Sequence, residues 1–178
     1  MPVSETTSAE TTQSPSSSNN NRPWSPTDPG MAMSGLAALL AGHNPPDLYQ
    51  WHSAAHVPDV QHAVEHAGWE FVYLDGWTIE DKESFLKAAA HAFDAEDEKG
   101  ASFDALSDCL GDVDTHDHAG VVLLWDGWSP LARHDEQAFN VALSVLGGRA
   151  HADRGCKFAA LLRGDGPPID VPELPAKR

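Results

Sequence analysis

Residues 120–125 have the sequence GVVLLW, which indicates the fold class of this chain. Its side chains are apolar at successive positions and do not alternate with polar ones, which is the pattern of a strand covered on both faces. Strands of this kind belong to parallel sheets, whose connections pass through helices. A parallel sheet packed with helices is therefore the first expectation.

Shorter patterns extend this expectation in both directions along the chain. Strand patterns occur at residues 48–51, 69–74 and 157–162, and helical patterns at 34–41, 57–67, 78–93, 102–113 and 135–146. Thr78 and Asp81 suit a capping box, and Gly147-Gly148 should weaken or end the last helix. The order predicts an α/β fold with a small parallel sheet of three core strands plus one N-terminal strand.

Composition divides the chain into four parts. The first 30 residues are mostly Ser, Thr, Asn and Pro, with Trp24 as almost the only large apolar side chain, so burial cannot offset the cost of ordering them. We expect residues 1–33 to be a disordered leader and 34–68 to add a strand and a helix to the main domain at 69–163. Residues 164–178, rich in Pro and Gly, are expected to form a loose tail.

The charge balance restricts the class of partner. The formal net charge is -16, from 27 acidic and 11 basic residues, which disfavours binding to nucleic acid or to an anionic membrane and favours a cationic protein. An acidic surface that only maintains solubility is the simpler alternative. The sequence shows no secretory signal pattern and no apolar run of about 20 residues, so we expect a cytoplasmic protein.

The acidic residues are concentrated in one region of the chain. Nine of them lie between positions 94 and 117, against a single lysine, Lys99. At 100° per residue, a helix over 102–113 gathers Asp104, Asp108, Gly111 and Asp112 opposite its apolar face. Asp104 offsets the helix dipole, but Asp108 repels the aspartate four residues earlier and so costs stability. This row of aspartates on one helix face suits binding to a cationic site on a partner protein, and an ordinary solvated face is the alternative.

A motif within this helix resembles the barstar family. The motif is Asp104-Ala105-Leu106-x-Asp108-Cys109-Leu110, with Gly100 four residues earlier, and Cys156 follows Gly155 at the start of the last strand. The resemblance covers residues 69–163 and implies a barstar-like domain there. In that family the helix and the loop before it plug the active site of a secreted ribonuclease, and the two aspartates replace the substrate's phosphates.

The resemblance implies an intracellular one-to-one inhibitor, an immunity protein rather than an enzyme, with no cofactor. The implied partner is a guanyl-preferring secreted ribonuclease or a ribonuclease toxin domain. The residues expected to bind it are Glu98, Ser102, Asp104, Ser107, Asp108, Gly111 and Asp112.

Several positions depart from the family pattern. Glu98-Lys99 replace aromatic residues before Gly100, and Ser102 replaces an asparagine. Ser107 takes the place of a tryptophan of the type member, and Ala150 lies where a later helix carries an acidic contact residue. These departures leave open a barstar-fold interaction module whose protein partner is not a ribonuclease.

Two other constellations offer alternative functions. Asp75 and Asp126 each end a predicted parallel strand, where active sites gather, and could form a catalytic pair, although turns and packing tryptophans explain both segments better. The segment His116-Asp117-His118 with Asp114 could hold a metal ion, although a solvated loop is the usual outcome for such residues.

Overall fold

A computed structural model of the protein describes residues 34–95, 102–113, 117–152 and 155–174. None of the helices in these ranges is long and apolar enough to cross a membrane. Helices and strands alternate along the chain, which confirms the α/β class, and the elements run α2 (Ser34–Leu40), β1 (Leu48–Gln50), α3 (Val57–His66), β2 (Glu70–Asp75), α4 (Lys82–Ala92), α5 (Phe103–Gly111), β3 (Gly120–Asp126), α6 (Ser129–His134), α7 (Glu136–Ala150) and β4 (Lys157–Arg163).

The four strands form one parallel sheet in the order β1-β4-β3-β2. The N-terminal strand β1 therefore adds to a three-stranded sheet, as predicted, and the structure places it at the outer side of β4. Side chains of β3 alternate between two separate cores: Val121, Leu123 and Trp125 enter one, and Val122 and Leu124 enter the other. Burial on both faces is the physical reason for the unbroken apolar stretch.

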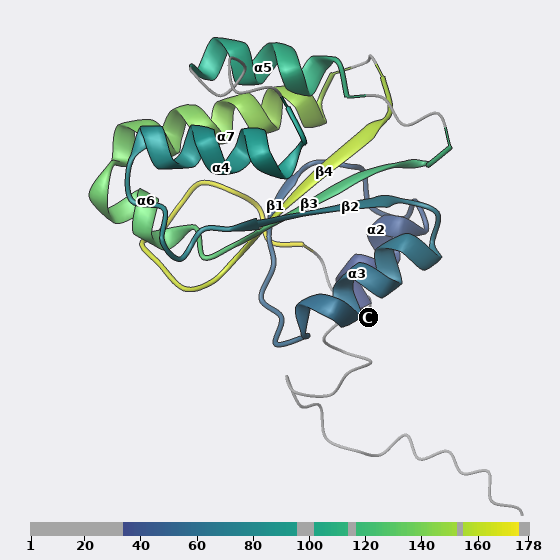
Figure 1. Ribbon diagram of the computed structural model, residues 1–178. Coiled ribbons are helices and arrows are strands. Elements are labelled where there is room, and N and C mark those ends of the chain that lie inside the picture. Colours follow the sequence, from purple (N-terminus) through teal and green to yellow (C-terminus); the bar gives the residue numbers. More distant parts are fainter. Residues whose placement is uncertain (1–33, 96–101, 114–116, 153–154, 175–178) are drawn as a thin grey trace, which may run out of the picture.

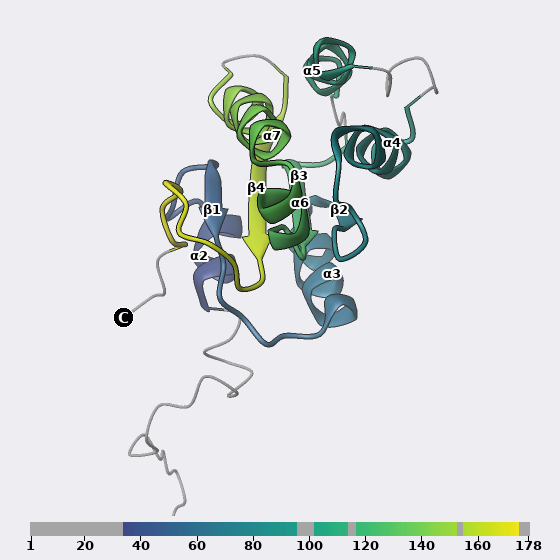
Figure 2. The same cartoon turned by 90° about the vertical axis from the view of Figure 1, so that its left-hand side faces the viewer.

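Helices cover both faces of this sheet (Figure 1). Helices α2 and α3 pack on one face and share a core with the side chains of Val122 and Leu124. Helices α4, α6 and α7 lie on the opposite face. Helix α5 packs on α4 and α7, farther from the sheet than either, as the turned view in Figure 2 shows. The acidic helix is thus the outermost element on its side of the molecule.

The start of α4 differs from the prediction. Asp81, not Thr78, is the N-cap residue: its carboxylate accepts a hydrogen bond from the Ser84 amide at 2.8 Å, and the Asp81 amide donates to the Ser84 hydroxyl at 3.3 Å. Thr78 belongs instead to a turn, which the Ile79 amide closes by donating to the Gly76 carbonyl at 3.1 Å. The capping box exists, one turn later than expected.

Two differences lie between β3 and β4. Helix α6 was not predicted, although Pro130 at its start is a recognised signal for a helix N-terminus. Helix α7 continues through both glycines to Ala150. Leu146 and Arg149 are buried on either side of that pair, and such packing outweighs the weak helix propensity of glycine.

The C-terminal segment is not loose up to residue 174, contrary to expectation. Val171 and Leu174 are buried, and the segment pairs with β1. The Gln50 amide donates to the Pro172 carbonyl and the Leu174 amide donates to the Gln50 carbonyl, both at 2.8 Å. This pairing supplies backbone partners to β1, which as an edge strand would otherwise leave its outer groups to solvent.

Candidate protein-interaction site on helix α5

Helix α5 begins at a strong local cap. Ser102 has extended backbone angles, φ -156° and ψ 162°, and its hydroxyl accepts a hydrogen bond from the Ala105 amide at 3.0 Å. Asp104 follows in the first turn, where a negative charge stabilises the helix dipole. Of the predicted contact residues, Ser102 therefore has a structural role, because its side chain fixes the start of the helix.

The rest of α5 separates into an apolar and an acidic face, as predicted. Phe103, Leu106, Cys109 and Leu110 are buried, and the Phe103 ring lies 5.9 Å from the ring of Phe85 on α4. The acidic face is exposed and consists of Asp104, Ser107, Asp108, Gly111 and the C-cap residue Asp112. Glu98, the remaining predicted contact residue, lies outside the described residues.

The carboxylates of the acidic face are not neutralised by neighbours within the described part of the chain. None of the ion pairs found there involves Asp104, Asp108 or Asp112. Asp104 and Asp108 are one helical turn apart, so their Cβ atoms are separated by about 5–6 Å. The helix thus presents closely spaced negative charges to solvent, and an approaching cation meets carboxylates that are not paired with any described residue.

A groove of about 750 Å³ separates the acidic face from α7. We call it the α5–α7 groove. Four predicted contact residues come together on one wall, whereas Ser102 and Asp104 lie nearer the helix start and do not line it. The complete lining is Ser107, Asp108, Gly111, Asp112, Ser144, Val145, Gly148, Arg149 and Ala152.

Sequence reasoning missed the second wall of the α5–α7 groove. Ser144, Gly148 and Ala152 recur every fourth residue, which places small side chains along one face of α7 and its end. That spacing could have indicated a small-residue face. Its position opposite α5 could not be predicted, because it depends on how the two helices pack.

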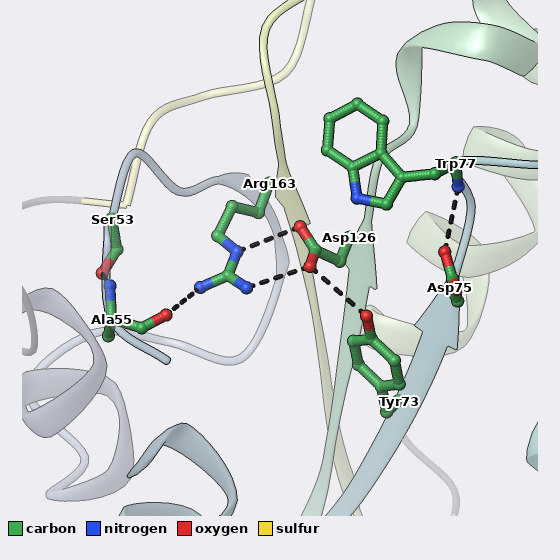
Figure 3. A network of polar contacts seen from close by, with 7 residues as sticks. All are labelled: Ser53, Ala55, Tyr73, Asp75, Trp77, Asp126 and Arg163. Carbon is green, nitrogen blue, oxygen red and sulfur yellow. Dashed lines mark hydrogen bonds and ion pairs between the residues drawn. The ribbon is translucent and has the colours of Figure 1, made fainter. Parts of the chain in front are cut away.

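A second polar cluster lies at the carboxyl ends of the strands (Figure 3). Asp126 at the end of β3 forms an ion pair with Arg163 and accepts a hydrogen bond from the Tyr73 hydroxyl at 3.4 Å. Burial and the neighbouring Asp126 carboxylate raise the pKa of Tyr73, so the phenol stays protonated and remains a donor. The Asp75 carboxylate accepts from the Trp77 amide at 3.1 Å.

These contacts bear on the alternative of a catalytic pair. Asp75 and Asp126 are register partners on adjacent strands, as the sequence suggested. Each carboxylate nevertheless has its own structural partners, with Asp75 closing a turn and Asp126 held by an arginine. Their proximity is explained by strand pairing and loop geometry.

The alternative metal site falls partly outside the described residues. Asp114 and His116 are not among them, whereas Asp117 and His118 are. Within the described ranges, no group of three or more His, Cys, Asp or Glu side chains is arranged to hold a metal ion.

Comparison with known proteins assigns the chain to a family. A search of the curated proteins returned no match. The family model described as Barstar (barnase inhibitor) matches residues 69–163, more than half of the 178 residues. The match runs from just before β2 to the end of β4 and includes α5 and α7. It confirms the resemblance found in the Asp104–Leu110 motif, and the chain belongs to the Barstar (barnase inhibitor) family.

Proposed function

We propose that the protein is an intracellular inhibitor that binds a ribonuclease one to one and blocks its active site with helix α5. The observation that carries the proposal is the exposed acidic face, whose aspartates form no ion pair within the described residues. A ribonuclease gathers Arg, Lys and His around a phosphodiester, and carboxylates held on a helix can occupy that positive field. Membership of the Barstar (barnase inhibitor) family also supports an inhibitory function.

The way in which α5 is held supports a binding role for its outer face. Ser102 caps the first turn, and the apolar face is buried against α4 and α7. A surface that is ordered before binding loses less conformational entropy when the partner arrives. Ordering of the helix therefore subtracts little from the binding free energy that the aspartates supply.

The proposed contact surface continues from the acidic face into the α5–α7 groove. Asp108 and Asp112 line its α5 wall, and the opposite wall combines the small residues Ser144, Gly148 and Ala152 with Val145 and the largely buried Arg149. A long basic side chain of the ribonuclease can enter between them and meet the carboxylates from the side. Both walls are part of the proposed interface.

The experiment is a titration of guanyl-preferring ribonucleases with the purified protein. We expect inhibition that saturates at one to one and weakens as salt is added, because the contact is between opposite charges. Asp108→Asn should weaken inhibition by at least about tenfold, the loss of a charge-assisted hydrogen bond. Asp59→Asn on α3, beyond the opposite face of the sheet, is the matched control that removes one exposed carboxylate.

The two variants test whether α5 is the contact surface, and the wild type tests whether the target is a ribonuclease. Equal inhibition by the Asp108→Asn and Asp59→Asn variants would show that α5 is not the contact. Failure of the folded wild type to inhibit any guanyl-preferring ribonuclease would contradict the proposed target. That result would favour the interaction-module alternative and lead to a search for a different protein partner.

A further inference from the structure

Arg149 is a charged side chain buried in the last turn of α7, with 6% of its surface exposed. It reaches from α7 to the end of α5: its Nε donates to the Leu110 carbonyl at 2.7 Å and its Nη2 to the Val113 carbonyl at 3.1 Å. Nη2 also donates to the Cys156 carbonyl at 3.1 Å, just before β4. One side chain therefore joins the end of α7 to the end of α5, 36 to 39 residues earlier, and to the residue just before β4, seven residues later.

The end of α5 has a physical need for such a partner. The last carbonyls of a helix lack intrahelical donors and form the negative end of its dipole. Many helices end with a left-handed glycine directly after the C-cap residue, but in α5 the C-cap residue Asp112 is followed by Val113, which has no positive φ. The Leu110 carbonyl already accepts from the Val113 amide at 3.2 Å, and Arg149 gives it a second donor. Arg149 also donates to the Val113 carbonyl just beyond the helix and places a positive charge at the negative helix end.

The surroundings of Arg149 fix its guanidinium. Its Cζ lies 5.4 Å from the centre of the Phe158 ring on β4, so the planar group is held by a cation–π contact. Gly155 has φ +75°, and a Cβ there would lie 3.2 Å from Nη2. Glycine is favoured at that position both by its backbone angle and by the space that the guanidinium occupies.

We propose that Arg149 is a positioning residue for the inhibitory surface. It fixes the C-terminal half of α5, which carries Asp108 and Asp112, against α7 and β4. Although Arg149 lines the α5–α7 groove, its donors point at backbone carbonyls and little of it is exposed, so it acts through α5 and not by touching the partner. The effect on a partner rests on the proposed function.

The first test needs no partner. Arg149→Lys keeps the charge but replaces the planar fork with a single ammonium group, which cannot reproduce the separate donations from Nε and Nη2. Hydrogen exchange should accelerate about tenfold at the amides of Asp112 and Val113, which bond to the Asp108 and Leu110 carbonyls. Amides of β3 should keep their protection. Arg133→Lys, at an exposed arginine of α6, is the control.

The second test asks whether Arg149 acts through the aspartates. Arg149→Lys should weaken ribonuclease inhibition about tenfold in the wild-type background and have little further effect when Asp108→Asn and Asp112→Asn are already present. Equal losses in both backgrounds would overturn the positioning role. Arg149→Met extends the series if the Lys variant behaves as wild type in exchange, since it removes the charge as well.

The hydrogen-exchange test is independent of the proposed function, whereas the second test requires a ribonuclease that the wild type inhibits. If the wild type inhibits no ribonuclease, the exchange measurement still decides the role of Arg149 in α5. Unchanged exchange at Asp112 and Val113 in both the Lys and the Met variant would overturn the inference even if inhibition were strong.

Discussion

Arg163 at the end of β4 donates to both carboxylate oxygens of Asp126 at the end of β3, with Nε to Oδ1 at 3.1 Å and Nη2 to Oδ2 at 3.0 Å. The two residues are register partners on neighbouring strands, and each side chain is 13% exposed. Arg163 also donates to the Ala55 carbonyl beyond β1, and Asp126 accepts from Tyr73 on β2. The pair thus connects the carboxyl ends of β3 and β4 with Tyr73 on β2 and with the loop that follows β1.

Removing one member of this pair should destabilise the fold. In Asp126→Ala, Arg163 keeps a largely buried charge without its carboxylate, at a cost of about 3 kcal/mol in the free energy of unfolding. Asp126→Ala combined with Arg163→Met should cost less than the sum of the two single changes, because neither charge is then left unpaired. Chemical denaturation of the three variants measures this, and simple additivity would contradict it.

The two glycines of α7 provide a matched test of the α5–α7 groove. A Cβ at Gly147 or Gly148 would meet nothing within 4 Å, but only Gly148 lines the groove. Leucine at either position should raise the free energy of unfolding by about 0.5 kcal/mol through better helix propensity. Only Gly148→Leu should weaken inhibition, by filling the space that the partner enters. Equal inhibition by both variants would place the contact outside the groove.

Both tyrosines of the chain should have a pKa above the ordinary tyrosine value. Burial and then the Asp47 carboxylate raise the pKa of Tyr49, and burial and then Asp126 raise that of Tyr73. The folded protein therefore holds these protons above pH of about 10, where the unfolded chain releases them. This contribution to stability is complete below about pH 10 and is lost as the pH rises through the native pKa values.

Ultraviolet absorbance of tyrosinate measures this titration directly. The folded protein should show no tyrosine with an ordinary pKa, and the chain in denaturant should show two. Tyr73→Phe isolates Tyr49. A native titration step at the ordinary tyrosine pKa of about 10 in the wild type would contradict the prediction.

The N-cap of α4 should make stability depend on pH in the acid range. Hydrogen bonds from Ser84 lower the pKa of Asp81, so the cap stabilises the fold above the unfolded pKa of about 3.9 and is lost as the pH falls through the native value. Asp81→Ala should lower the Tm at neutral pH, and its difference from wild type should shrink toward acid pH. A difference that stays constant in thermal melts across this range would exclude the charged cap.

The sheet and the acidic helix were predictable because their signals are local. The unbroken apolar stretch at 120–125 follows from burial on both faces, and the separation of α5 into two faces follows from helical periodicity. Family membership was likewise visible in the Asp104–Leu110 motif. Each of these depends on residues that are close together in the sequence.

Features that depend on long-range packing were not predictable. Nothing near Arg149 in the sequence indicates that it bonds to Leu110 and Val113, 39 and 36 residues away. The small residues of α7 line a groove only because α5 packs opposite them. The segment ending at Leu174 is held by hydrogen bonds to β1, which lies far away in the sequence. Helix α6 was a different kind of error, because its proline signal was available locally.

The outermost position of α5 has an evolutionary consequence. Its exposed side chains point away from both cores, so replacements there leave the sheet and the helices that cover it intact. Single substitutions on this face can therefore change the binding surface without unfolding the domain. The exposed face of α5 can therefore vary in sequence while the two cores of the domain stay the same.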